Sequence, residues 1–434
     1  LLSQKITKGI NGSVEIPGDK SISHRSIIIP SISNGITEIK NLLWSDDVIN
    51  TLNAFKLLGV KIEKNNQDII IHGKGLNSLK ESSEKIYLGN SGTSARLLIG
   101  LLSAQKFNSI LTGDDSLSKR PMNRIINPLE KMGAKFESIE HKLPLKIIGQ
   151  KLKSVNYELE LPSAQVKSGM LLAALNTKGK SKIIEKNITR NHTEIMLEYF
   201  GANIEVKKTN SINHITIEGK KELKSKNINV PSDLSSASFF IIASLINSNS
   251  KLDIKNININ PSRDGILSVL KKMGAKLEIK NKRTINGELI GDIVCESSQL
   301  NGCDLDKSIA KLMIDEFPIL SIAASFAQSP SVFRGLGELR VKESDRLELI
   351  RLNLDQCGVS CKIINDDLYI NPSEKKYQKG IEIKTDFDHR IAMSFAVMGT
   401  KLDSDLSIDN KESISTSFPN FIETFNKIGG NLSG

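Results

Sequence analysis

A nine-residue motif recurs six times along the chain, and no other feature constrains the fold as much. The copies are FKLLGVKIE (55–63), LEKMGAKFE (129–137), LEYFGANIE (197–205), LKKMGAKLE (270–278), LDQCGVSCK (354–362) and FNKIGGNLS (425–433). Each copy has an apolar pair, a glycine and an alternating stretch, which predicts a helix ended by a left-handed glycine and followed by a strand. The spacing of roughly seventy residues exceeds that of common solenoid repeats.

Repeated helix–strand units are typical of α/β proteins in which helices cover sheets. The chain has 434 residues, too many for one ordinary core, so six units divide naturally into two domains of three. The segment PSDLSSASFFIIASLI (231–246) predicts a helix that opens the second half, with the main boundary near residue 230. Helix starts with capping residues are predicted at WSDD (44–47), TRNHTE (189–194), PSRDG (261–265) and KESDR (342–346).

The net charge of +10 raises the alternative of an RNA-binding protein built on the same repeats. The lysines are scattered, however, and the sequence has no ladder of aromatic side chains on which bases could stack. A steep salt dependence of RNA binding would support this alternative. We expect no nucleic-acid partner and a positive charge that matters only locally.

The spacing of cysteines and histidines, and the lengths of apolar stretches, limit which cofactors and which compartment we expect. The four cysteines form no CxxC pair, and the six histidines form no HxH or HExxH pattern. A GxGxxG fingerprint for a dinucleotide is also missing, so we expect neither a metal nor a bound dinucleotide. The N-terminus has no apolar signal region, and no stretch is long enough to span a membrane. We expect a cytoplasmic protein with no membrane partner, and a monomer, because no extra interface segment is apparent.

Polar loops rich in cations lead repeatedly into apolar helices. In PGDKSISHRS (17–26), Lys20, Ser21 and Arg25 suit an anion at a helix N-terminus, and YLGNSGTSARLL (87–98) offers a small-residue loop. Arg120 precedes Pro121, so its backbone is expected to be extended. In the segment SAQVKS (163–168) the theme recurs with Ser163, Gln165 and Lys167. If these helix ends converge, they form a positive cleft for substrates with several negative charges.

Carboxylates gather in the second half of the chain. Asp315 stands at the edge of the apolar segment LMIDEFPILSIAASFA (312–327), where its pKa would rise and suit a general base. A helix cap with an acidic first turn is the alternative for Asp315 and Glu316. The charged run LRVKESDRLELI (339–350) could equally form surface ion pairs. FDHRIAMSFAVMG (387–399) places Asp388, His389 and Arg390 before another apolar helix.

Seven segments together resemble the 5-enolpyruvylshikimate-3-phosphate (EPSP) synthase family, in order and over nearly the whole chain. They are PGDKSISHRS, LGNSGTSARLL, SKRPM, SAQVKSGMLLAAL, DEFPIL, LRVKESDRL and DHRIAM. The combination is specific, although single segments are not, and two of them resemble the bacterial branch often called class II. The resemblance implies a two-domain enolpyruvyl transferase fold with six βαβαββ units, three per domain around a pseudo-threefold axis. It implies domains of residues 15–230 and of residues 1–14 plus 231–434, which close on substrate.

The resemblance also implies the reaction. The 5-hydroxyl of shikimate 3-phosphate attacks C2 of phosphoenolpyruvate, and a tetrahedral intermediate then eliminates phosphate without a cofactor. The related UDP-N-acetylglucosamine enolpyruvyl transferases are an alternative, but many of them use a cysteine that the loop TGDDSLSKRP (112–121) lacks. A substrate-binding protein without catalysis is another alternative, which an intact Asp315, Lys342 and Glu343 argue against.

Matching positions carry the implied roles. Catalysis falls to Asp315 as the base for the 5-hydroxyl, Glu343 as the proton donor to the methylene carbon, and Lys342, Lys20 and His389. Shikimate 3-phosphate is expected at Lys20, Ser21, Arg25, Ser163, Ala164, Gln165, Arg190, Asp315 and Lys342. Phosphoenolpyruvate is expected at Lys20, Gly92, Arg120, Gln165, Arg346 and Arg390.

Three positions are compared with the family pattern. Thr416, in STSFPNF (415–421), stands where many members have a lysine that contacts phosphoenolpyruvate. Ala164 replaces a second serine of the other branch. Gly92 is present where glyphosate-insensitive relatives often carry alanine, so we expect a glyphosate-sensitive protein.

Overall fold

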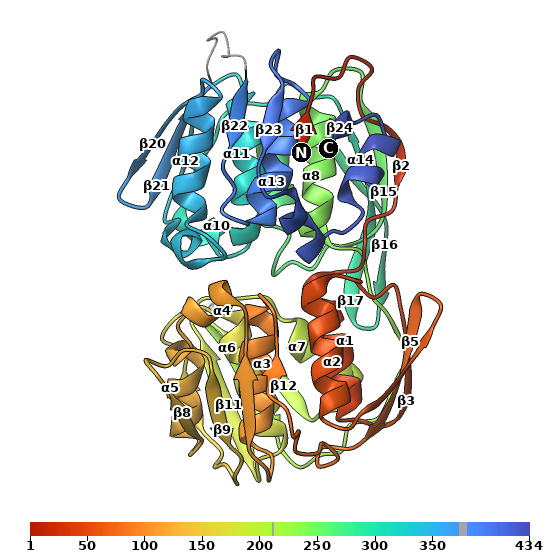
Figure 1. The fold of residues 1–434 in the computed structure, drawn as a ribbon, viewed down its shortest axis with the longest axis vertical. Helices are drawn as coiled ribbons and strands as arrows, with labels where there is room; N and C mark the ends of the chain where they lie inside the picture. The colour runs from red at the N-terminus through yellow and green to blue at the C-terminus, as the bar shows by residue number, and fades with distance from the viewer. Residues whose placement is uncertain (211, 373–379) are drawn as a thin grey trace. The chain divides into compact units, whose positions relative to one another are not determined.

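The computed structural model describes residues 1–210, 212–372 and 380–434. Contacts within it divide the chain into two compact units. The N-terminal unit consists of Gly18–Pro231 and Thr284–Glu288, and the C-terminal unit of Leu1–Pro17, Ser232–Arg283 and Leu289–Gly434. Each unit is therefore assembled from more than one stretch of the chain (Figure 1).

The N-terminal unit alternates helices with short strands. Its helices are α1 (Lys20–Ser31), α2 (Asp46–Leu57), α3 (Gly92–Ser103), α4 (Asp115–Lys119), α5 (Asn123–Lys131), α6 (Ala164–Leu175) and α7 (His192–Tyr199). Its strands are β3 (Asn34–Lys40), β4 (Lys61–Asn65), β5 (Asp68–Lys74), β6 (Ile86–Tyr87), β7 (Ser109–Thr112), β8 (Lys135–Ser138), β9 (Leu145–Ile148), β10 (Asn156–Glu158), β11 (Lys180–Glu185), β12 (Ile204–Thr209), β13 (Ile212–Glu218) and β14 (Ile228–Asn229). In the described ranges these strands form three sheets, ordered β14-β3-β5-β4, β6-β7-β9-β8 and β10-β11-β13-β12.

The C-terminal unit follows the same plan. Its α-helices are α8 (Leu234–Ile246), α9 (Gly265–Lys272), α10 (Lys307–Ala310), α11 (Phe317–Ser325), α12 (Arg346–Gln356), α13 (His389–Gly399) and α14 (Phe421–Lys427), and its 3-10 helices are η1 (Ile314–Glu316), η2 (Gly337–Val341) and η3 (Lys411–Thr416). Its strands are β1 (Leu2–Ser3), β2 (Asn11–Val14), β15 (Lys251–Asn258), β16 (Lys276–Ile285), β17 (Glu288–Glu296), β18 (Asp304–Leu305), β19 (Ser331–Phe333), β20 (Ser360–Ile364), β21 (Asp367–Asn371), β22 (Ile381–Ile383), β23 (Leu406–Ile408) and β24 (Leu432–Ser433). Over the residues that can be described, the sheet orders are β16-β17-β15-β2, β18-β19-β21-β20 and β22-β23-β1-β24.

All six sheets share one pairing scheme. In the N-terminal unit, β14, β6 and β10 each run parallel to the next strand, which is antiparallel to the one after it. In the C-terminal unit, β2, β18 and β22 take the same place. The predicted α/β fold with six repeated units is confirmed.

The repeat glycines take the backbone conformation that the motif predicts. Each follows a helix and precedes a strand, and each has a positive φ, which costs glycine little because it lacks a Cβ atom. The φ angles are 83° for Gly59, 93° for Gly133, 86° for Gly201, 91° for Gly274, 75° for Gly358 and 110° for Gly429.

Helix capping follows the sequence less closely. The predicted helix over 231–246 is confirmed as α8, whose N-cap Asp233 accepts a hydrogen bond from the backbone of Ser235. Asp345 likewise caps α12. Ser45, Asn191 and Asp264 occupy N-cap positions, but their side chains make no capping hydrogen bond. The expectation of side-chain caps at these three helix starts is therefore wrong.

Each unit has its own apolar core. In the N-terminal unit, α3 packs against α1 and α6, and in the C-terminal unit α8, α11 and α13 pack against one another (Figure 1). The central helices are apolar nearly all round, as buried helices are. Along the described ranges, no helix has both the length and the apolar character needed to cross a bilayer.

Candidate active site

The predicted site residues stand mainly at the N-terminal ends of helices in the two units. We call Lys20, Ser21, Arg25, Gly92, Arg120, Ser163, Ala164, Gln165 and Arg190 the N-terminal set. We call Asp315, Lys342, Glu343, Arg346, His389 and Arg390 the C-terminal set. Helix N-termini expose backbone N–H groups and favour anions, so their repeated use suits charged substrates.

Arg25 lies on α1 and joins three helices of the N-terminal unit. Its guanidinium donates to the Ser21 carbonyl at 2.7 Å, to Ser168 Oγ on α6 at 2.8 Å and to Thr193 Oγ1 on α7 at 2.6 Å. Burial lowers the pKa of Arg25 to about 10, while Glu194 opposes this shift. Since the groups that Arg25 contacts directly are neutral, its positive charge is not cancelled by an ion pair.

The nearby charge of Arg190 also lowers the pKa of Arg25, so these two residues, both predicted to bind shikimate 3-phosphate, lie within electrostatic reach. Lys20 begins α1, and its ammonium lies 2.5 Å from Asp47 Oδ2 at the start of α2. Sequence reasoning missed this carboxylate. A signal was present, because Asp47 belongs to the acidic helix start that the WSDD segment predicts.

Arg120 and Gly92 lie together, as the resemblance implies. Arg120 has an extended backbone (φ −75°, ψ 135°), which confirms the effect expected of Pro121. Its guanidinium donates to Ser116 Oγ at 3.1 Å, to the Asn90 carbonyl at 3.3 Å and to Asn90 Oδ1. A Cβ atom built on Gly92 would lie 3.3 Å from Arg120 Nη1. Glycine therefore keeps the space beside this guanidinium open.

Gln165 is held from two directions on α6. Its amide donates to Thr93 Oγ1 at 2.9 Å, and its carbonyl accepts from Arg96 Nη1 at 2.8 Å. Arg96 also donates to the Gly92 carbonyl at 3.3 Å. Sequence reasoning missed Arg96, although its spacing of four residues from Gly92 places both on one helix face.

Lys167 does not join these residues. Its side chain is fully buried and pairs with Glu194 Oε1 at 2.7 Å and Glu185 Oε1 at 3.1 Å. The expectation that Lys167 contributes to a polar helix entrance is wrong, because it lies about one helical turn further into α6, where Glu185 and Glu194 hold its ammonium in the core. Ser163 remains at the entrance and caps α6 by accepting from the Val166 backbone N–H.

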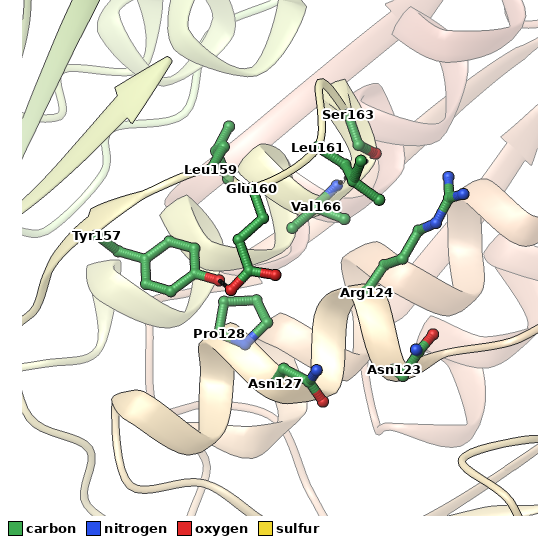
Figure 2. Close-up of a pocket in the computed structure, with 10 residues that line it drawn as sticks. All are labelled: Asn123, Arg124, Asn127, Pro128, Tyr157, Leu159, Glu160, Leu161, Ser163 and Val166. Atoms are coloured by element: carbon green, nitrogen blue, oxygen red, sulfur yellow. Dashed lines mark hydrogen bonds between the residues drawn. The ribbon is translucent and has the colours of Figure 1, made fainter. Parts of the chain in front are cut away.

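A surface pocket adjoins Ser163. Figure 2 shows Arg124 on one side of it, with its side chain extending toward Ser163. The other lining residues are Asn123, Asn127, Pro128, Tyr157, Leu159, Glu160, Leu161 and Val166. The pocket thus includes one member of the N-terminal set.

Arg346 forms the centre of the C-terminal set. Nε donates to Asp388 Oδ2 at 2.7 Å, Nη1 to Asp315 Oδ1 at 3.3 Å, and Nη2 to Glu343 Oε2 at 2.5 Å. Burial by itself would lower the pKa of Arg346, but the charges of Asp388, Glu343 and Asp315 outweigh it and raise the pKa. The alternative of solvated surface pairs is therefore wrong for Arg346, whose side chain is 1% exposed.

Asp315 lies in surroundings that differ from those predicted. Its carboxylate is 3.3 Å from Arg346 Nη1 and 3.9 Å from Lys342 Nζ. The expectation of a carboxylate among apolar neighbours is wrong, because the 3-10 turn η1 directs the side chain toward cations. The capping alternative holds for position, since Glu316 is the N-cap of α11 and both acids lie in the first turn of η1, but the Glu316 side chain makes no capping hydrogen bond.

His389 and Arg390 begin α13, whose N-cap Asp388 accepts from the Arg390 backbone N–H at 2.9 Å. Arg390 Nη1 donates to the Asp315 carbonyl at 3.3 Å. His389 Nδ1 lies 3.3 Å from Thr416 Oγ1. Thr416, which departs from the family pattern, therefore contacts a predicted site residue. The C-terminal set thus lies around one network of contacts within its unit.

The cysteines are reduced, and burial raises the pKa of Cys295, Cys357 and Cys361 to about 12 and that of Cys303 to about 11. Thiols with such pKa values are poor nucleophiles at neutral pH. Within the described ranges, no group of three or more His, Cys, Asp or Glu side chains has a geometry that could hold a metal ion.

Comparisons with known proteins show the family to which the chain is similar. The family model described as EPSP synthase (3-phosphoshikimate 1-carboxyvinyltransferase) matches residues 4–425. A curated 3-phosphoshikimate 1-carboxyvinyltransferase from Ruthia magnifica is 46% identical over 99% of this chain and 98% of its own. One from Petrotoga mobilis is 45% identical over 97% and 98%.

Solved structures show the same fold. EPSP synthase from Acinetobacter baumannii superposes with a TM-score of 0.87 and 42% identity, over 99% of this chain and 98% of its own. The enolpyruvyl transferase NikO from Streptomyces tendae has a TM-score of 0.79 at 14% identity, which is a likeness of fold alone. On the full-length family match and the identity to its relatives, the chain belongs to the EPSP synthase (3-phosphoshikimate 1-carboxyvinyltransferase) family.

Proposed function

We propose that this protein transfers the carboxyvinyl group of phosphoenolpyruvate to the 5-hydroxyl of shikimate 3-phosphate and releases phosphate. The reaction belongs to the shikimate pathway of aromatic amino acid biosynthesis. The observation that carries the proposal is the cluster of Asp315, Lys342 and Glu343 around Arg346, in a chain of this family. A protein that only binds substrate would have no need for carboxylates and a lysine in this arrangement.

The proposed ligands of shikimate 3-phosphate are Lys20, Ser21, Arg25, Ser163, Ala164, Gln165, Arg190, Asp315 and Lys342. Its phosphate is matched by the charges of Arg25 and Arg190, whose electrostatic coupling the pKa of Arg25 reflects. Ser163, Ala164 and Gln165 stand at the N-terminal end of α6, where hydroxyl, amide and backbone N–H groups suit a ring with hydroxyls. Lys20 and Ser21 complete this group.

Phosphoenolpyruvate has a carboxylate and a phosphate, which the planar guanidinium groups of Arg120, Arg346 and Arg390 can bind bidentately. Arg120 contacts only neutral groups, so it can accept an anion without breaking an ion pair. Arg346 donates to three carboxylates, so an incoming anion competes with Asp315 or Glu343 for one of its N–H groups. Binding of phosphoenolpyruvate would thereby release a carboxylate for proton transfer.

Addition begins when the Asp315 carboxylate takes the proton of the 5-hydroxyl, whose oxygen bonds to C2 of phosphoenolpyruvate. Glu343 must be protonated for this step, and it gives that proton to the methylene carbon, which becomes a methyl group and leaves Glu343 as a carboxylate. Positive charge that develops at C2 is stabilised by both carboxylates. The tetrahedral intermediate then loses a methyl proton to the Glu343 carboxylate as its C2–O bond to phosphate breaks, and Asp315 returns its proton to the departing phosphate. Lys342, Lys20 and His389 assist these steps. We propose that no cofactor takes part.

The proposal also covers the compartment, the oligomeric state and the partners of the protein. The protein acts in the cytoplasm as a monomer, with two small-molecule substrates and without nucleic acid or membrane. The lack of a side chain at Gly92 supports sensitivity to glyphosate, because a Cβ atom there would crowd Arg96 and Arg120.

The test measures phosphate release from phosphoenolpyruvate in two parallel reactions. One contains shikimate 3-phosphate, and the other contains UDP-N-acetylglucosamine. Release with shikimate 3-phosphate alone is the expected result. Release with the nucleotide sugar alone would overturn the acceptor, and release with neither, from protein shown to be folded, would overturn the transferase reaction.

A further inference from the structure

A buried chain of polar side chains ends at the residue next to Asp315. Glu316 is only 1% exposed, and its Oε1 accepts a hydrogen bond from Ser235 Oγ. Arg263 Nη2 donates to Ser235 Oγ at 2.6 Å and to Asp233 Oδ1 at 3.0 Å. Asp233, Arg263 and Ser235 are buried too. None of these four residues belongs to the predicted site.

The direction of each hydrogen bond follows from the groups themselves. A guanidinium can only donate, so the Ser235 hydroxyl accepts from Arg263 and gives its single proton to Glu316. The Ser235 backbone N–H donates to Asp233 Oδ1 at 2.8 Å, as part of the α8 cap. Ser235 is therefore fixed at its backbone and at its hydroxyl. Its hydroxyl in turn holds the Glu316 carboxylate in place.

Arg263 has a counterpart at the equivalent position of another repeat unit. Arg263 stands eleven residues before Gly274, as Arg190 stands eleven residues before Gly201. The two arginines thus occupy equivalent places in two repeat units, but Arg263 is buried. Burying an arginine with two carboxylates has a large desolvation cost, and apolar side chains in their place often stabilise a protein more. A task other than stability would explain the arrangement.

The link to the reaction is the turn η1, where Glu316 and Asp315 share a peptide bond. The Asp315 carboxylate accepts from Arg346, and its carbonyl accepts from Arg390. A fixed Glu316 therefore restrains both groups that Asp315 presents. We propose that Asp233, Arg263, Ser235 and Glu316 form a positioning chain that holds Asp315, and the carbonyl bound by Arg390, in the geometry for transfer. This inference rests on the proposed function.

The test variant is Ser235→Ala, which removes one oxygen and leaves the backbone cap at Asp233 intact. We expect kcat to fall at least about tenfold, because small misplacements of a reacting group are costly. KM for both substrates should stay within about twofold, as expected when ground-state binding is unchanged. Ser235→Thr keeps the hydroxyl and should restore most of kcat.

Ser244→Ala is the matched control. Ser244 lies on the same helix, is equally buried, and donates to the Cys295 carbonyl at 3.3 Å. We expect this variant to keep the wild-type kcat and to melt within a few degrees of Ser235→Ala.

Two results would overturn the inference alone, provided that the wild type releases phosphate with shikimate 3-phosphate. One is a wild-type kcat in Ser235→Ala. The other is an equal loss of kcat in Ser235→Ala and Ser244→Ala, which would indicate a packing role. A folded wild-type protein without phosphate release would overturn the proposed function, and this inference with it.

Discussion

Arg25 and Arg120 of the N-terminal set are held in a different way from Arg346 of the C-terminal set. In the N-terminal unit, Arg25 and Arg120 donate to hydroxyl, amide and carbonyl oxygens, all of them neutral. In the C-terminal unit, Arg346 donates to three carboxylates. The pKa of Arg25 is accordingly lowered by burial, whereas that of Arg346 is raised by its anionic neighbours.

This difference separates two tasks that a transferase must perform. An arginine held by neutral dipoles keeps its charge available for a substrate anion, while its geometry is already set. An arginine held by carboxylates keeps those carboxylates in place near the reacting atoms. The comparison therefore predicts that changes at Arg25 and Arg120 act mainly on substrate binding, and that changes at the carboxylates Asp315 and Glu343 act mainly on turnover.

The largest effect is expected for Asp315→Ala. Loss of the proposed base should lower kcat by about 10²–10⁴-fold, the usual contribution of a general base. The protein should fold and still bind both substrates, because the arginines proposed to bind them are unchanged. Phosphate release and substrate binding by calorimetry would measure the two effects separately, and a near-wild-type rate would remove Asp315 from the mechanism.

Arg120→Ala should act on binding instead. Loss of a charge-assisted contact is worth about 1.5–3 kcal/mol, so KM for phosphoenolpyruvate should rise by about ten- to a hundredfold. Steady-state kinetics with each substrate varied in turn would show whether shikimate 3-phosphate is unaffected. Unchanged saturation by phosphoenolpyruvate would contradict the assignment of Arg120.

Gly92→Ala should have a smaller effect in the same direction. The added Cβ would lie 2.9 Å from Arg96 Nη1 and 3.3 Å from Arg120 Nη1, so the flexible ends of both side chains must shift. We expect KM for phosphoenolpyruvate to rise by about fivefold, as for roughly 1 kcal/mol of overpacking. Glyphosate inhibition should weaken as well, and equal inhibition of both proteins would argue against crowding at this position.

The last prediction concerns stability, not catalysis, and the neutral state of His24 beside Arg25. Burial, and then the charges of Lys20 and Arg25, lower the pKa of His24 well below 6.5. Below about pH 6.5 the unfolded chain therefore binds a proton that the folded protein does not. The free energy of unfolding should then decrease with falling pH, by up to about 1.4 kcal/mol per pH unit.

His24→Asn removes this proton and keeps an oxygen that can face Thr51 Oγ1, which lies 2.8 Å from His24 Nδ1. Urea unfolding between about pH 5 and pH 8 should show a weaker pH dependence in this variant than in the wild type. His141→Asn, at an exposed histidine, is the control. Equal slopes in the two variants would show that His24 is protonated in the folded protein.

The fold could be predicted from the sequence to a large extent because its signals are local. A glycine such as Gly59 or Gly358 reports a positive φ at its own position, and the alternating residues that follow report a strand. The capping at Ser45, Asn191 and Asp264 was not predictable in this way, because a cap depends on whether the side chain can reach a backbone N–H. The helix positions were right, while the hydrogen bonds were not.

The site illustrates the same division. The residues of SAQVKS and KESDR could be identified from their motifs, and Arg120 has the extended backbone that Pro121 predicts. Their partners could not be identified, since Arg346 and Asp388 are 42 residues apart in the chain. Asp315 was expected among apolar residues because its sequence neighbours are apolar, whereas its spatial neighbours are cations.

The sequence by itself thus determined the six repeat units, the helix starts and the chemistry available at them, because period, glycine and motif are properties of short segments. Only the tertiary structure decided which charge faces which. It turned Lys167 and Arg263 inward while Ser163 and Arg190 kept some exposure, and it surrounded Arg346 with carboxylates. The physical reason is that the ionic environment of a side chain depends on residues that the fold brings close from distant parts of the chain.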